Sequence, residues 1–324
     1  MTDSPAIEAL GLTKRFGDLT AVDGVSFAVP AGTVLGLLGP NGAGKTTIVR
    51  MMTTLSLPTG GTARVNGHDV IAEPEEIRRS IGLTGQAATV DEILTGRENL
   101  RMIGGLYGIG RTDLARRTDE LLEQFSLTDA ADKQARSYSG GMRRRLDLAV
   151  SLLAAPPVLF LDEPTTGLDP RSRNELWEVL RELVEAGTTL LLTTQYLEEA
   201  DHLADDIVVI DRGTVIAHGT PLQLKQQAGA ASVVVTVSEP ADLPAAREIV
   251  RRTGSEVFVD EAARTLTTAA SGLSELTRIA NWFDESGIAV DDLGLVRPSL
   301  DDVFLTLTGH KAADIGAAEG ASAS

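Results

Sequence analysis

A glycine-rich stretch near the N-terminus carries the clearest chemical signal in the sequence. It reads GPNGAGKTT and comprises Gly39, Pro40, Asn41, Gly42, Ala43, Gly44, Lys45, Thr46 and Thr47. Glycines let the backbone wrap closely around a phosphate group, so that successive N–H groups and a following helix N-terminus face it. Lys45 adds a positive charge for the phosphates, and the Thr46 hydroxyl is a ligand for Mg²⁺. The pattern predicts a phosphate-binding loop rather than a chance glycine turn.

Two adjacent carboxylates follow a short apolar run later in the chain. Val158–Leu161 has the continuous hydrophobic pattern of a strand buried on both faces, and Asp162 and Glu163 come directly after it. Parallel strands end at one edge of a sheet, so these acids are predicted to lie beside the phosphate-binding loop. Asp162 is expected to hold Mg²⁺, and Glu163 to act as general base toward an attacking water. Taken alone, the pair is equally typical of a capped strand end.

Strand and helix patterns alternate around these motifs, which predicts an α/β fold with a doubly covered parallel sheet. A β-rich stretch extends to about Gly85, a mostly helical subdomain covers about 88–155, and a helix is expected over Glu175–Glu185. The first domain is predicted over residues 1–225, followed by a linker at 226–231. Residues 232–310 show the order β-α-β-β-α-β, which indicates a small ferredoxin-like α+β domain. The Ala/Gly/Ser-rich residues 311–324 are expected to be disordered.

Composition excludes several classes of protein. Lys and Arg number 29 against 46 Asp and Glu, and a formal net charge of −17 disfavours nucleic acid as a partner. Without cysteine there can be no disulfide and no thiolate metal site. The longest apolar stretch, Leu148–Leu161, is broken by Ser151 and by Pro156–Pro157, so it is too short to span a bilayer. The expected location is therefore the cytoplasm.

A third motif, Tyr138-Ser139-Gly140-Gly141-Met142, points to a family. It resembles the signature of ABC ATPases, whose usual form is Leu-Ser-Gly-Gly-Gln. The resemblance implies a P-loop NTPase core and ATP with Mg²⁺ as ligands. It also implies that Ser139, Gly140 and Gly141 bind the γ-phosphate held by a second subunit. A serine and two glycine amides at a helix start are suited to receiving an anion. The three arginines that follow are expected on a solvated helix face.

Further residues match ABC landmarks in order along the chain. The resemblance implies that Phe16 stacks on adenine, that Gln86 senses Mg²⁺ and the γ-phosphate near the membrane partner, and that Asp169 lies in the loop crossing the dimer. Gln195 occupies the switch position, where the family usually has histidine, and is assigned a catalytic role beside Glu163. Read alone, Phe16 is more typical of a core residue, and either glutamine of an exposed one.

A narrower likeness involves three segments: 138–145, 193–197 and 300–304. They are similar to those of the daunorubicin-resistance ATPase subunits of actinomycetes. That likeness implies export of a drug or antibiotic-like molecule through a separate integral-membrane permease. The subunit is then a head-to-tail homodimer with two shared ATP sites, peripheral on the cytoplasmic face of the membrane. Export of a lipid or polysaccharide, or a soluble ATP-dependent regulatory role, remains open as an alternative.

Three other classes of ABC protein fit the sequence less well. Translation-linked factors carry two ATPase cassettes, whereas this chain has one phosphate-binding loop. Chromosome and repair ATPases insert a long coiled coil between the two motif groups, and the interval between Lys45 and Asp162 is too short for one. A non-catalytic nucleotide sensor is expected to lack the general base, yet Glu163 is present.

Overall fold

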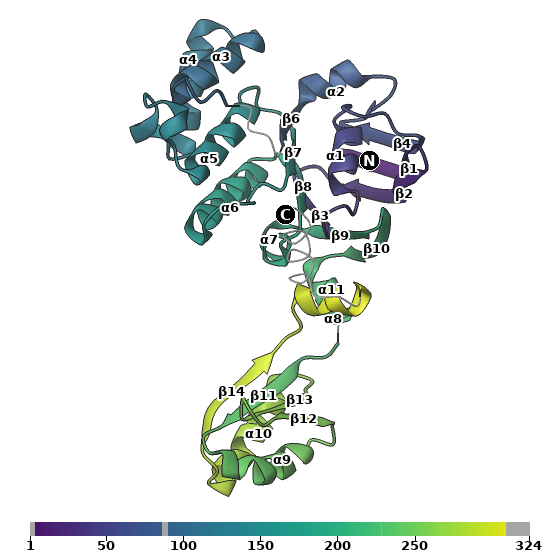
Figure 1. Ribbon diagram of the computed structural model, residues 1–324, viewed down its shortest axis with the longest axis vertical. Coiled ribbons are helices and arrows are strands. Elements are labelled where there is room, and N and C mark those ends of the chain that lie inside the picture. Colours follow the sequence, from purple (N-terminus) through teal and green to yellow (C-terminus); the bar gives the residue numbers. More distant parts are fainter. Residues whose placement is uncertain (1–3, 86–89, 228, 309–324) are drawn as a thin grey trace, which may run out of the picture. The chain divides into compact units, whose positions relative to one another are not determined.

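The computed structural model describes residues 4–85, 90–227 and 229–308 (Figure 1). The described chain divides into two compact units between Pro221 and Leu222. The predicted linker begins inside a helix, α8 (Pro221–Gln227), and the predicted C-terminal tail lies outside the described residues.

The first unit is built on a six-stranded sheet with the order β10-β9-β3-β8-β7-β6. Five of its strands are parallel, and β10 pairs antiparallel with β9 at one edge. Every residue of β3, β7 and β8 is buried, as expected for strands covered on both faces. The strands are β3 (Val34–Leu38), β6 (Ile81–Thr84), β7 (Val158–Asp162), β8 (Thr189–Thr194), β9 (Asp206–Asp211) and β10 (Thr214–Gly219).

A second, antiparallel sheet lies beside the first in the same unit. Its order is β2-β1-β4-β5, and helix α1 packs between the two sheets, where its apolar side chains share one core with both (Figure 1). This core fixes α1 directly after β3. The elements are β1 (Ile7–Phe16), β2 (Leu19–Val29), α1 (Lys45–Met52), β4 (Gly60–Val65) and β5 (His68–Asp69).

Helices occupy the interval between β6 and β7. The helical subdomain begins with α3, whose start has a reciprocal capping box between Thr95 and Glu98, and it ends with α5. Its elements are α3 (Gly96–Leu106), α4 (Arg111–Gln124), the short 3₁₀ turns η1 (Thr128–Ala130) and η2 (Ala135–Ser137), and α5 (Gly140–Ser151). The remaining helices of this unit are α2 (Pro74–Ser80), α6 (Pro170–Glu185) and α7 (Leu197–Leu203).

Two local expectations differ from the structure. The stretch read as β-rich up to Gly85 contains α2, which begins with a proline and has acidic residues in its first turn. Helix α6 begins at Pro170 instead of Glu175, because Asp169 caps it and proline is suited to the first helical position. The sequence assigns Asp169 to a loop, and its role as the cap that begins the helix appears only in the structure.

The second unit confirms the ferredoxin-like pattern. Its sheet has the order β12-β13-β11-β14 with every pairing antiparallel, and α9 and α10 share its core. The described chain ends with α11, whose start has the reciprocal hydrogen bonds of a capping box between Ser299 and Asp302. The elements are β11 (Ser232–Val237), η3 (Pro240–Asp242), α9 (Leu243–Arg251), β12 (Val257–Asp260), β13 (Thr265–Ala269), α10 (Leu273–Ser286), β14 (Val290–Val296) and α11 (Leu300–Thr308).

Candidate ATP site

The phosphate-binding loop joins β3 to α1 and leaves no room for side chains at two of its glycines. A Cβ atom at Gly39 would lie 2.2 Å from the Ile210 carbonyl oxygen, and one at Gly44 would lie 2.5 Å from the Ala21 carbonyl oxygen. Gly44 also has φ of +105°, which side-chain-bearing residues rarely adopt. The backbone therefore packs closely at the start of α1, where N–H groups without helical partners can receive an anion.

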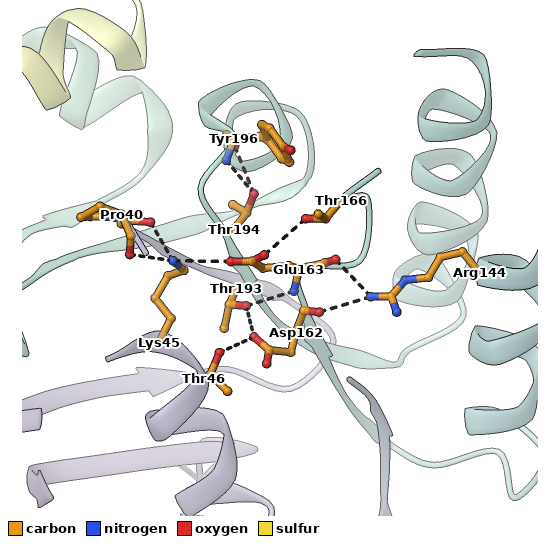
Figure 2. A network of polar contacts seen from close by, with 11 residues as sticks. Pro40, Lys45, Thr46, Arg144, Asp162, Glu163, Thr166, Thr193, Thr194 and Tyr196 are labelled. Atoms are coloured by element: carbon orange, nitrogen blue, oxygen red, sulfur yellow. Dashed lines mark hydrogen bonds and ion pairs between the residues drawn. The ribbon is translucent and has the colours of Figure 1, made fainter. Parts of the chain in front are cut away.

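Lys45 is the first residue of α1, and only 4% of its surface is exposed. Its ammonium donates hydrogen bonds to the carbonyls of Gly39 and Pro40, at 2.7 and 3.0 Å, and lies 3.8 Å from Oε1 of Glu163 (Figure 2). Burial lowers the pKa of Lys45, and the carboxylates of Glu163 and Asp162 oppose that shift. A lysine cation is thus held inside the loop close to the two acids.

Asp162 ends β7 and is almost completely buried. Its Oδ1 accepts hydrogen bonds from the hydroxyls of Thr46, at 3.1 Å, and Thr193, at 2.6 Å. Thr193 was not identified from the sequence. It lies opposite Asp162 in the parallel pairing of β7 with β8, so only the sheet order could have revealed the contact.

Glu163 follows the strand in a left-handed conformation, with φ of +51°. Its N–H donates to the carbonyl and the hydroxyl of Thr193, both at 3.1 Å. Its carboxylate accepts from the Thr166 hydroxyl at 3.3 Å (Figure 2). A glutamate held at positive φ costs free energy, and such strain is typical of residues at functional sites.

A cavity of about 890 Å³ opens over these residues. Its lining includes the loop residues Asn41–Thr47, Glu163, Gln195 and Gly140 at the start of α5. The phosphate-binding loop, both predicted catalytic residues and part of the signature therefore line the same cavity. The cavity lining also includes Thr166–Leu168, just before Asp169, and the residues Ala21, Arg143, Arg144 and Asp147.

Other predicted site residues lie outside that lining in the described part of the chain. Phe16 is 53% exposed at the end of β1, with the Lys14 ammonium 4.9 Å from its ring centre. Ser139 caps α5 by accepting from the Met142 N–H at 3.2 Å. Asp169 caps α6, and the Ser172 N–H lowers the pKa of the Asp169 carboxylate. Gln86 lies outside the described residues.

Two signature residues also have packing roles that the sequence did not reveal. A Cβ atom at Gly141 would lie 2.6 Å from the Ser172 hydroxyl, so the glycine allows α5 to approach the start of α6. Tyr138, which replaces the usual leucine, is buried and donates its hydroxyl to the Ala130 carbonyl at 2.7 Å. The signature loop is therefore anchored from both sides.

The arginine run is not a solvated face, contrary to the sequence-based expectation. The side chains of Arg144 and Arg145 are 14% and 13% exposed, and Arg143, at 40%, is the most exposed of the three. Arg145 donates to the Phe125 carbonyl at 3.2 Å and pairs with Glu175 at 3.3 Å. Charge patterning failed here because α5 is enclosed by other elements of the same unit.

The sequence profile of the ABC transporter family matches residues 22–166. The daunorubicin resistance ATP-binding protein DrrA2 of Streptomyces coeruleorubidus is 54% identical over 98% of this chain and 100% of its own length. The chain belongs to the ATP-binding subunits of ABC transporters. It is accordingly an ATP-binding protein and an ATPase.

Two further likenesses agree with this family. The Nod factor export ATP-binding protein I of Ralstonia nicotianae is 40% identical over 96% of both chains. A solved ATP-binding subunit of an ABC transporter superposes with a TM-score of 0.62 and 30% identity, covering 68% of this chain and 92% of that one. These comparisons confirm the predicted ABC ATPase fold. No helix among the described residues of this ABC subunit is long and apolar enough to cross a membrane.

Proposed function

We propose that this ATPase energises export of a drug or antibiotic-like small molecule through a separate integral-membrane permease. The observation that carries the proposal is the 54% identity to a daunorubicin resistance ATP-binding protein, over 98% of this chain and the full length of that relative. Its presence as a peripheral subunit on the cytoplasmic face of the membrane is part of the same proposal. The net charge of −17 argues against nucleic acid as a partner.

In this proposal ATP lies against the loop between β3 and α1. The N–H groups of Gly42 and Gly44 and the Lys45 ammonium face the phosphates, with Thr46 and Thr47 at the first turn of α1. The exposed ring of Phe16 is available to stack on adenine. The close backbone packing at Gly39 and Gly44 supports this assignment, because neither position admits a side chain and the loop can therefore fold tightly between β3 and α1.

The donor set at Thr46 and Asp162 fits Mg²⁺. A hydroxyl and a carboxylate oxygen lie 3.1 Å apart, and Mg²⁺ prefers hard oxygen ligands from one or two carboxylates together with substrate phosphates. The described residues hold no cluster of three or more His, Cys, Asp or Glu, which agrees with a metal shared with phosphate rather than caged by protein. Gln86 completes the proposed set. When bound, Mg²⁺ would supply charge neutralisation for the phosphates.

The proposed reaction is the in-line attack of water on the γ-phosphorus of ATP. The Glu163 carboxylate accepts the proton of the water, the bond between the β,γ-bridging oxygen and the γ-phosphorus breaks, and ADP and phosphate are formed. Gln195 lines the same cavity and can donate to the γ-phosphate while it orients the water. These are the two catalytic residues of the proposal.

The active form in this proposal is a head-to-tail homodimer with two shared ATP sites. Ser139, Gly140 and Gly141 contact the γ-phosphate bound to the partner, and Asp169 belongs to the loop that crosses between subunits. ATP then favours the closed dimer because the signature contact exists only there. Closure would move the permease, and hydrolysis would reset the cycle.

Glu163→Gln tests the shared site directly. The amide cannot accept the proton of water, so we expect kcat to fall by roughly 10²- to 10⁴-fold while ATP binding persists. The protein should elute as a dimer in size-exclusion chromatography with ATP and as a monomer without it. A Glu163→Gln protein that remains monomeric with ATP would contradict the shared-site model.

Transport is tested by expressing the chain with a candidate permease in a drug-sensitive host. We expect wild-type cells to accumulate less anthracycline than cells that carry Lys45→Ala with the same permease. The second candidate is export of another substrate class, favoured by the 40% identity to a Nod factor export protein. Unchanged drug accumulation, together with ATPase activity stimulated by a lipid or an oligosaccharide, would decide for that candidate.

A further inference from the structure

The side chain of Arg144 has no part in the proposed reaction, yet it is among the most extensively bonded groups near the site. It lies on α5 two residues after the signature motif, and 14% of its side-chain surface is exposed. Its guanidinium donates hydrogen bonds to four backbone carbonyls. The acceptors are Gly85 at 2.7 Å, Pro164 at 2.8 Å, Glu163 at 3.1 Å and Asp162 at 3.2 Å.

Those carbonyls belong to the segment that holds the general base. Asp162, Glu163 and Pro164 are consecutive, and Gly85 follows the neighbouring strand β6. Figure 2 shows the Arg144 side chain reaching from α5 to the backbone of Asp162 and Glu163, on the side away from Lys45. The guanidinium therefore joins the signature helix to the ends of two sheet strands.

The conformation of Glu163 explains why such a fixing group is needed. Its φ of +51° is unfavourable for a residue with a side chain, so the peptide groups on both sides must be held. Thr193 accepts the hydrogen bond from the Glu163 N–H, and Arg144 donates to the Glu163 carbonyl. Asp147, whose carboxylate lies 3.7 Å from the guanidinium, holds the charge of Arg144 in place.

We propose that Arg144 is a positioning residue for the ATPase reaction: its planar guanidinium fixes the backbone of Asp162–Pro164 so that the Glu163 carboxylate faces the attacking water. This inference rests on the proposed role of Glu163 as general base. Arg144 also lines the cavity, but in this proposal it acts through the backbone of the base segment. Guanidinium geometry is essential, because the five N–H donors of arginine are fixed in one plane whereas the three of lysine are grouped at one atom.

Arg144→Lys is the main test, because it keeps the charge beside Asp147 but cannot bond four separate carbonyls. We expect kcat to fall by roughly 10- to 100-fold, with the affinity for a non-hydrolysable ATP analogue changed by about twofold or less. Arg144→Gln, which has similar reach and fewer donors, is the second variant and should show the same division between kcat and binding.

Arg145→Lys is the matched control on the same helix. Arg145 is equally buried, but it bonds the Phe125 carbonyl and Glu175 rather than the segment of the base. We expect its kcat to stay within about twofold of wild type, with a similar loss of melting temperature to Arg144→Lys. Equal loss of kcat in both variants would show that Arg144 supports only the fold of α5, and would overturn the proposal.

A dimer assay distinguishes an effect of Arg144 on the position of Glu163 from an effect on the signature contact. The double variant Arg144→Lys/Glu163→Gln should still form the ATP-dependent dimer of Glu163→Gln, because the proposed defect concerns only the base. Loss of that dimer would assign Arg144 to the signature contact and overturn the inference. A wild-type chain without ATPase activity contradicts the proposed function, whereas active wild type and equally active Arg144→Lys contradict only the role of Arg144.

Discussion

The phosphate-binding loop and the start of α5 each place a buried cation beside Glu163, and the two cations are held differently. Lys45 donates to two carbonyls of its own loop, and its remaining donor faces Glu163 at a longer distance of 3.8 Å. Arg144 bonds four carbonyls from the ends of two strands and also pairs with Asp147. Lys45 can therefore exchange loop carbonyls for phosphate oxygens, whereas Arg144 is committed to the scaffold. Lys45 is therefore suited to binding a ligand, and Arg144 to holding the backbone in one geometry.

Lys45→Ala should give the largest loss of ATP binding and hydrolysis. The phosphates lose the lysine of the loop, and we expect ATP binding to weaken at least tenfold and hydrolysis to become undetectable. Isothermal titration and an ATPase assay measure the two effects. Lys133→Ala, which removes an exposed lysine in the helical subdomain, is the control and should behave as wild type. Full ATPase activity in Lys45→Ala would contradict the assignment of the phosphate-binding loop.

Ser139→Arg should spare nucleotide binding but abolish hydrolysis, because the serine serves the site of the partner subunit. The replacement also removes the cap of α5, which costs about 1 kcal/mol of stability. Thr95→Ala removes a comparable cap from α3 and is the matched control for that loss. Thr95→Ala should therefore lose stability while its hydrolysis stays near wild type.

Mixing Ser139→Arg with Lys45→Ala sharpens the same prediction. A head-to-tail heterodimer then contains one site with both an intact loop and an intact signature. We expect the mixture to recover activity that neither variant shows alone. If each subunit hydrolysed ATP in a self-contained site, the mixture would stay inactive.

Gln195 gives a prediction of intermediate size. It lines the cavity, and its amide offers two donors and an acceptor without an ionisable proton. We expect Gln195→Ala to lower kcat by roughly 10²-fold with a smaller change in ATP affinity, as for other groups that stabilise a transition state. Gln195→His should keep substantial activity and add a pH-dependent limb near pH ~6.5, where histidine titrates. Unchanged turnover in Gln195→Ala would show that this residue is a spectator.

The smallest expected effect on activity is at Tyr138, which helps to hold the start of α5 in place. Tyr138→Phe removes the hydroxyl that donates to the Ala130 carbonyl and leaves that carbonyl without this partner. We expect a loss of about 1–2 kcal/mol in the free energy of unfolding, measured by urea denaturation, with kcat within about twofold of wild type. A large loss of kcat at unchanged stability would place Tyr138 in the chemistry instead.

The local sequence was sufficient for several arrangements whose residues are close along the chain, although it missed the Asp169 cap of α6. Lys45 and its carbonyl partners are five and six residues apart, so a short motif contains the whole arrangement. The same holds for the capping box of Ser299 and Asp302 and for the buried strand that ends at Asp162. Alternating strand and helix patterns likewise predicted the α/β core and the β-α-β-β-α-β order of the second unit.

Only the tertiary structure revealed the contacts between residues that are far apart in the sequence. Arg144 reads as one member of a charged run, and its carbonyl partners lie 18 to 59 residues away in the sequence. Thr193 meets Asp162 only because β8 pairs with β7, and Gly141 must be small only because α5 approaches Ser172. A residue type and its neighbours in sequence indicate what a side chain can bond. Sheet order and helix packing determine which distant backbone groups it meets. The difference between Lys45, which can bind phosphate, and Arg144, which holds the backbone, therefore emerges only in the folded chain.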